Sequence, residues 1–214
     1  MKKFTMLFSL FFVLFLVGCS EQSIETITDP DTKSKVEVVT NIESKMILYK
    51  NMYDNMDRGN HDFFDQDIVV DTQHYDENQI KRGEIVYYKT PTVNNPNLSP
   101  SEKSISRVIA LSGEKIKVEK GQIYINGKML DTFYGKYHNR GANIDDYKKM
   151  LKEGNSSDHV NGYISQIENT NMQEIAIPQG HVFIIGDTWD RSIDSREFGP
   201  LPQEKIIGKV IGYK

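Results

Sequence analysis

The sequence predicts a mainly β fold, and two observations support this prediction. Short runs of β-branched and aromatic residues, which favour strands, recur along the chain. Residue pairs containing glycine, which favour turns, fall between these runs. A chain of 214 residues is long enough for one domain with a substantial core. The predicted strands are residues 46–50, 67–71, 84–89, 105–111, 115–119, 122–127, 181–187 and 206–213.

The first 18 residues have the layout of a secretory signal peptide. Lys2 and Lys3 precede an apolar run from Phe4 to Val17. This run is shorter than the roughly 20 residues that span a bilayer core, so we expect cleavage and not a permanent transmembrane helix. The run ends in LVGC at residues 16–19, which resembles the lipobox of bacterial lipoproteins, where the cysteine receives lipid.

Cys19 is the single cysteine of the chain. An exported protein with one thiol cannot form an internal disulfide, and lipid attachment gives this residue a role. The alternative is that Cys19 lies by chance near an ordinary cleavage site. We expect a lipid anchor that holds the exported protein on the outer face of the cell membrane.

The remaining chain divides into a tether and a folded unit. Residues 19–44 are polar without a sustained apolar period, which predicts a flexible, lipidated tether. We expect the folded unit to cover residues 45–214. Within it, residues 132–174 are rich in Asn, Lys, Asp and Gly, and residues 143–154 predict a helix. We interpret 132–174 as a small α-containing subdomain inserted between two strands; a solvated loop is the alternative.

Composition and charge narrow the classes of function. The formal net charge is -4 at pH 7, which does not favour binding of nucleic acid. The five histidines are scattered without ligand-like spacing, and the cysteine is expected to carry lipid. The sequence therefore predicts no metal site and no cofactor.

The most informative segment is GDTWDRSIDSREFG at residues 186–199, which follows a predicted strand. Asp194 and Arg196 are placed for a charge-assisted pair, and Ser192 and Ser195 can hydrogen-bond within the turn. On chemistry alone this segment is a polar turn. As a pattern it resembles the last conserved box of bacterial signal peptidase I, in which glycine-aspartate is followed by serine-x-aspartate-serine-arginine and an aromatic-glycine pair.

Two further segments carry the same resemblance. RVIALSGEKI, which begins at Arg107, and the following QIYINGK resemble the family's apolar strand, glycine turn and hairpin. KRGEIV at residues 81–86 resembles another of its strands. The resemblance covers about residues 46–213 and implies a signal peptidase I-like β-fold of antiparallel sheets. It implies supporting roles at the site for Met56, Arg107, Asp187, Ser192, Asp194, Ser195 and Arg196.

The two catalytic residues of this family are replaced here. Signal peptidase I uses a serine hydroxyl as nucleophile and a buried neutral lysine, whose pKa burial lowers, as general base. The matching positions carry Asn55 and Ser106, and Asp57-Arg58-Gly59 stand where proline-threonine normally follows. A carboxamide nitrogen is not an acyl-transfer nucleophile, and an alcohol of very high pKa is not a base near neutrality. The resemblance therefore implies that the dyad chemistry is lost.

Three hypotheses follow from the resemblance and its departures. The first is an inactive homologue whose groove binds extended, signal-peptide-like segments or an active signal peptidase. Met56 and the strand around Val108 are expected to line this groove. The second is an active signal peptidase I-type serine endopeptidase that uses substitute residues. The third is a structural or accessory surface lipoprotein with an empty groove. The candidate substitutes are Lys103, which lies three positions before Ser106, and, by residue type alone, Asp54, Asp57, His61 and His74.

Overall fold

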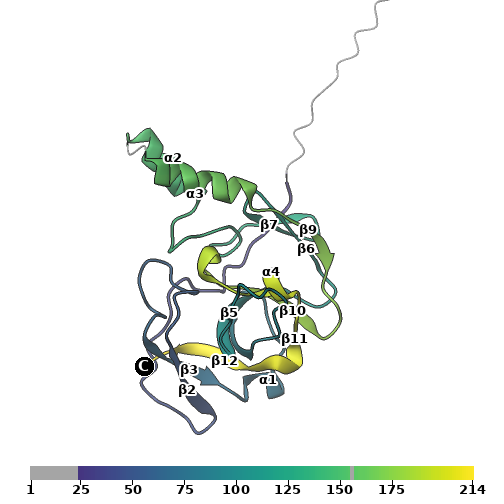
Figure 1. The fold of residues 1–214 in the computed structure, drawn as a ribbon. Coiled ribbons are helices and arrows are strands. Elements are labelled where there is room, and N and C mark those ends of the chain that lie inside the picture. Colours follow the sequence, from purple (N-terminus) through teal and green to yellow (C-terminus); the bar gives the residue numbers. More distant parts are fainter. Residues whose placement is uncertain (1–23, 155–156) are drawn as a thin grey trace, which may run out of the picture.

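The computed structural model describes residues 24–154 and 157–214, which form two β-sheets and several helices (Figure 1). The larger sheet contains β2 (Met46–Asn51), β3 (Gln66–Asp71), β4 (Ile85–Lys89), β5 (Lys103–Ala110), β10 (His181–Ile185), β11 (Leu201–Pro202) and β12 (Ile206–Tyr213). The smaller sheet contains β1 (Thr26–Ile27), β6 (Lys115–Glu119), β7 (Gln122–Ile125), β8 (Lys128–Leu130) and β9 (Met172–Ala176). The helices are α1 (His74–Glu77), α2 (Ile144–Lys152), α3 (Asp158–Asn169), α4 (Ser195–Phe198) and the 3-10 turns η1 (Trp189–Arg191) and η2 (Gln203–Lys205).

Antiparallel pairing dominates both sheets. The seven-stranded sheet has the order β11-β10-β5-β4-β12-β3-β2, with antiparallel neighbours throughout. The five-stranded sheet has the order β1-β8-β7-β6-β9, and its one parallel pair is β1 with β8. The predicted mainly β fold is confirmed. Each predicted strand overlaps an observed one, whereas β1, β8, β9 and β11 were not predicted because they are short and carry no clear apolar alternation.

The segment predicted to be helical forms α2. The Asn143 side chain accepts a hydrogen bond from Asp145 N (2.9 Å), and the Asp146 side chain accepts one from Asn143 N (2.9 Å), which together make a capping box. The helix α3, which the sequence did not predict, packs beside α2 through the stacked rings of Tyr147 and Tyr163, 5.0 Å apart. The two helices pack together beyond the five-stranded sheet (Figure 1).

Residues 24–44, predicted to belong to a flexible tether, follow the surface of the domain instead. β1 pairs with β8, and further along Val39 N donates to Tyr213 O (2.8 Å). Between these points Tyr134 Oη donates to Asp29 Oδ2 (2.5 Å). Residues 24–39, here called the strap, thus connect one sheet to the other. Backbone pairing of this kind leaves no apolar pattern in the sequence, which explains the difference. Residues 19–23 and the lipobox lie outside the described residues.

Three apolar clusters form the core. One lies between the five-stranded sheet, the helices α2 and α3, and one end of the larger sheet, where Ile109 and Phe183 are buried. The other two cover opposite faces of the seven-stranded sheet, one around Met56 and Ile105 and the other around Tyr88. Burial on both faces makes this sheet a rigid support for the loops at its edge.

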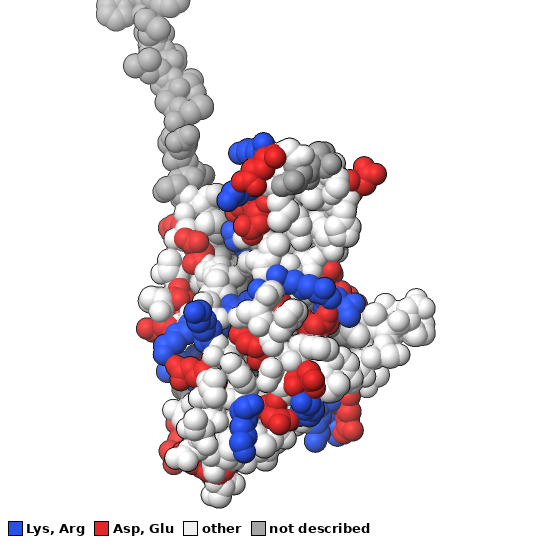
Figure 2. All heavy atoms as spheres, turned by 90° about the vertical axis from the view of Figure 1, so that its left-hand side faces the viewer, with Lys and Arg blue, Asp and Glu red and all other residues white. Residues whose placement is uncertain are grey.

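The exposed surface carries both signs of charge. Acidic and basic side chains are interspersed over the face shown in Figure 2. None of the helices described here has both the length and the apolar character needed to cross a membrane.

Candidate peptide-binding site

Asn55 lies in the loop after β2 and beside the edge of β5. Its Nδ2 donates a 2.7 Å hydrogen bond to the carbonyl oxygen of Ile105, and only 6% of the residue is exposed. Its Oδ1 atom is buried and has no hydrogen-bond partner among the described residues. The adjacent Met56 is fully buried in the core. The loop therefore holds the side-chain amide of Asn55 next to β5, and the buried side chain of Met56 fixes the loop to the core.

Ser106 lies on β5 immediately after Ile105 and is 1% exposed. Its Oγ is 3.3 Å from the Tyr88 hydroxyl, on the next strand. Burial raises the pKa of Tyr88 above its ordinary value, although the hydrogen bond with Ser106 opposes the shift. Tyr88 therefore stays a neutral phenol near neutral pH and does not act as a general base there.

The turn after β10 contacts the loop of Asn55 directly. Thr188 N donates to the Asn55 carbonyl oxygen (2.9 Å), and Ser192 Oγ donates to the same oxygen (3.2 Å) and to Thr188 O (2.6 Å). The Thr188 hydroxyl also donates to the carbonyl of Asp57. A Cβ at position 186 would collide with the Ser192 side chain and the Asn55 carbonyl, so this close approach requires Gly186.

The predicted pair of Asp194 and Arg196 stabilises this turn internally. Asp194 accepts hydrogen bonds from Gly186 N (3.0 Å) and from the Arg196 backbone and guanidinium. Arg196 also donates to Trp189 O (2.8 Å) and lies over the Trp189 ring. Ser195 Oγ accepts from Ile184 N (3.0 Å), which attaches the turn to β10. These residues position the turn but do not line the groove described below.

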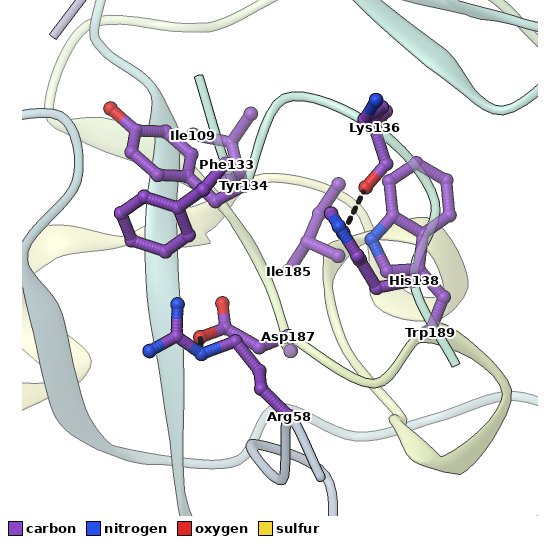
Figure 3. A pocket seen from close by; sticks show the side chains of 10 residues that line it. Arg58, Ile109, Phe133, Tyr134, Lys136, His138, Ile185, Asp187 and Trp189 are labelled. Carbon is purple, nitrogen blue, oxygen red and sulfur yellow. Dashed lines mark hydrogen bonds and ion pairs between the residues drawn. The ribbon is translucent and has the colours of Figure 1, made fainter. Parts of the chain in front are cut away.

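A buried ion pair joins β5 to the same turn. Arg107 donates two hydrogen bonds to the Asp187 carboxylate, at 2.8 and 2.6 Å. Arg58, which sequence analysis did not assign to this cluster, also approaches Asp187, with Nε 3.5 Å from Oδ2. Both guanidinium groups lie over the Phe133 ring. Figure 3 shows Arg58, Phe133 and Asp187 beside a small pocket that is also lined by His138, and this pocket has no room for a water molecule.

A surface groove opens above Asn55, and its cavity of about 60 Å³ is lined partly by the loop between β4 and β5. Thr90 Oγ1 in this lining is buried and, like Asn55 Oδ1, has no partner within the described part of the chain. Met56 and Val108, which were expected to line the groove, are fully buried and do not. The groove residues are Tyr53, Asn55, Thr90, Ser99, Pro100, Ser101, Ser104, Arg191 and Ile193.

Several groove residues were missed by the sequence analysis. Ser104 was recoverable, because period-two alternation places it on the same face of β5 as Ser106. Arg191 and Ile193 flank Ser192 inside the recognised box. The contribution of residues 99–101 depends on how a long loop folds back, for which the sequence holds no signal.

None of the candidate substitute bases lines the groove in the described structure. Asp54 binds Arg140 and Arg191, at 3.1 and 3.0 Å. Asp57 accepts hydrogen bonds from two backbone amides of its own turn, and its other oxygen is 2.9 Å from the His61 ring. The remaining candidates, Lys103 and His74, lie at the start of β5 and in α1. Across residues 24–154 and 157–214, no group of His, Cys, Asp and Glu is arranged to hold a metal ion.

Comparisons with known proteins identify the family. The family described as "Signal peptidase, peptidase S26" matches residues 38–213. Signal peptidase I V of Bacillus subtilis (strain 168) is 32% identical over 131 residues, which cover 61% of this chain and 64% of that protein. Signal peptidase IB of Staphylococcus aureus (strain COL) is 29% identical over 133 residues, covering 59% and 63%.

A crystal structure of a signal peptidase I from Enterococcus faecalis V583 is also similar, at 24% identity and a TM-score of 0.37, with 62% of this chain and 97% of that chain covered. This chain spans slightly less than two thirds of the length of the curated relatives that it matches. Because the family matches far more than half of the sequence, the protein belongs to the signal peptidase, peptidase S26, family.

Proposed function

We propose that this chain is a catalytically impaired signal peptidase homologue whose groove binds extended peptide segments. The observation that carries the proposal is the lining of the groove. Asn55 occupies it where the family resemblance places the nucleophile, and within the described residues no carboxylate, histidine or lysine side chain lines it.

The chemistry of the buried groups supports impairment. The lone pair of an amide nitrogen is delocalised, and Asn55 Nδ2 is already donating to Ile105 O. Ser106 and Tyr88 share a buried contact in which the raised pKa of Tyr88 excludes a phenolate base near neutral pH. Peptide hydrolysis by a nucleophile needs a group that removes its proton, and these residues provide none.

The edge of β5 supports peptide binding. β10 pairs with β5 at Arg107, Val108 and Ala110. In the described structure, the pairing between these two strands therefore does not reach residues 103–106 of β5. An extended peptide can add to such an edge through backbone hydrogen bonds. The buried acceptor Asn55 Oδ1, which has no partner among residues 24–154 and 157–214, would gain a donor from that peptide.

Anchoring to the outer membrane face through Cys19 is part of the proposal. It places the groove where segments of exported proteins, or an active signal peptidase, are accessible. Metabolic labelling with radiolabelled palmitate of bacteria that express the full-length protein or a Cys19→Ser variant tests the anchor: label on both proteins, or on neither, would contradict it.

Two measurements test the groove and the chemistry. The purified protein is incubated with a preprotein and the products are examined by mass spectrometry, while binding of the preprotein's extended peptide is titrated by fluorescence anisotropy. We expect saturable binding without cleavage. Specific cleavage that is lost in Asp54→Asn or His61→Gln would establish the active alternative, and absence of binding would favour an accessory lipoprotein.

A gain-of-function variant tests the assignment of the two positions. Asn55→Ser combined with Ser106→Lys is expected to introduce measurable cleavage, whereas each single change leaves the protein inactive because nucleophile and base are both needed. Thermal unfolding of each variant verifies that the fold persists. Cleavage by a single variant would contradict the assignment.

A further inference from the structure

Arg191 is the one charged residue that lines the groove in the described structure. It comes from η1, two positions before the groove residue Ile193, and more than half of its side chain is exposed. Every other lining side chain is neutral, so the charge of Arg191 is not cancelled inside the groove. A ligand group placed there meets a cation and hydroxyl or amide groups.

The position of Arg191 is set by Asp54. Arg191 Nε donates to both carboxylate oxygens, at 3.1 and 3.0 Å, and Arg140 Nη2 donates to one of them at 3.1 Å. Burial opposes ionisation of Asp54, but the hydrogen bonds from Arg191 and Arg140 outweigh it and lower the pKa of the carboxyl. The three side chains therefore carry a net charge of one positive unit near neutral pH.

This arrangement leaves hydrogen-bonding capacity at the groove. The two Nη groups of Arg191 make no hydrogen bond to another described residue, because its observed bonds to Asp54 use Nε alone. Guanidinium donors of this kind match the geometry of a carboxylate. Asn55 lines the same groove, and its buried Oδ1 is a hydrogen-bond acceptor that needs a donor.

We propose that the groove selects peptides that end in a free α-carboxylate, held by Arg191, while a backbone N–H donates to Asn55 Oδ1. The inference rests on the peptide binding proposed above and narrows its substrate class. A cavity of about 60 Å³ has room for a small terminal group, roughly the volume that two water molecules occupy in the liquid. A new carboxylate is what an endopeptidase generates, so this chain binds a cleavage product more tightly than the uncut chain.

The test compares two peptides of identical sequence, both N-acetylated and both ending in alanine, one as the free acid and one as the C-terminal amide. Their affinities for the full-length protein in detergent micelles are measured by isothermal titration calorimetry. We expect the acid to bind about fivefold more tightly than the amide, as for a partly exposed charged pair. Raising the ionic strength is expected to reduce this ratio.

Three variants assign the preference to Arg191. Arg191→Gln is expected to give equal affinity for acid and amide, and Arg191→Lys to keep part of the preference. The matched control is Lys35→Gln, which removes one positive charge from an exposed position on the strap, outside the groove. Circular dichroism verifies that each variant is folded.

The possible outcomes separate this inference from the proposed function. Binding of both peptides with equal affinity by the unmodified protein would overturn the carboxylate preference but leave peptide binding intact. A preference that persists in Arg191→Gln would overturn the role of Arg191. Failure of both peptides to bind would overturn peptide binding itself, and the inference with it.

Discussion

The side-chain amide of Asn55 donates a 2.7 Å hydrogen bond to the carbonyl oxygen of Ile105, the residue that precedes Ser106. The bond joins residues that are 50 positions apart in the sequence and places position 55 beside the strand that carries position 106. The two positions that the family resemblance assigns to a nucleophile and a base are therefore neighbours in the fold, although each carries a different residue.

Removing this amide is expected to reduce stability. Asn55→Ala deletes one buried hydrogen bond and should lower the free energy of unfolding by about 1–2 kcal/mol. Asn55→Asp should cost more, because a carboxylate would face the Ile105 carbonyl in a site that is 6% exposed. Urea unfolding measures both, with Asn41→Asp at an exposed position as the control. An Asn55→Asp variant as stable as the unmodified protein would contradict the contact.

The cluster of Arg58, Arg107 and Asp187 makes a different kind of prediction. Asp187→Asn keeps the shape of the side chain but leaves two buried guanidinium groups without their anion, which should cost about 3–5 kcal/mol. Arg58→Met should lower the free energy of unfolding by only about 1 kcal/mol or less. Burial of the Arg58 guanidinium, which lowers its pKa, is unfavourable and offsets most of the stability gained from its approach to Asp187.

A double-mutant cycle separates these contributions. In the Asp187→Asn background, Arg58→Met is expected to increase stability, because it removes one of two cations that repel each other. Chemical denaturation of the four proteins gives the coupling free energy. A loss of stability on Arg58→Met in both backgrounds would show that Arg58 acts by packing against Phe133 and not through charge.

How far the sequence predicts this fold depends on the type of contact. The central strands carry β-branched and aromatic runs, and α2 has an Asn143 cap, so both were predictable from local chemistry. The strap was not, because β1 is held by backbone pairing with β8. At the site, Asp194 and Arg196 are two residues apart and their pairing was predictable. Asp54 with Arg191, 137 positions apart, was not.

His138 should make stability depend on pH. Burial lowers the pKa of His138 below its ordinary value; Asp187 and the hydrogen bond to the Lys136 carbonyl oppose this shift, and the charges of Lys136 and Arg58 add to it. The folded state therefore keeps this ring neutral at a pH where the unfolded chain binds a proton. Its contribution is complete above the unfolded pKa, near 6.5, and is lost as the pH falls below it, with a slope of up to about 1.4 kcal/mol per pH unit.

Denaturant unfolding between about pH 5 and pH 8 measures this slope. His138→Gln is expected to flatten the dependence in the acidic part of the range, whatever its effect on stability at pH 8. The control is His159→Gln, which changes an exposed histidine on α3. An unchanged slope in His138→Gln would mean that the ring takes up its proton in the folded state as readily as in the unfolded chain.

The strap offers a prediction with a matched glycine control. A Cβ at Gly83 would collide with the side chains of Thr32 and Asp29, whereas a Cβ at Gly127 would meet nothing within 4 Å. Both glycines have positive φ, at 86° and 77°, so replacement by alanine costs about 1 kcal/mol of backbone strain at either site. Only Gly83→Ala should in addition displace the strap and expose it to trypsin, which cleaves after Lys33 and Lys35.

Limited proteolysis with mass spectrometry of the fragments measures that exposure. Gly83→Ala should be cut within the strap much faster than Gly127→Ala. Adding Thr32→Ala should restore part of the resistance, because the Thr32 hydroxyl is the nearest atom to the new methyl group. Equal cutting of the two glycine variants would show that the strap does not depend on its approach to Gly83. Because Thr32→Ala leaves the backbone strain at position 83 in place, a restored resistance would show that the contact between Thr32 and position 83 holds the strap on the domain.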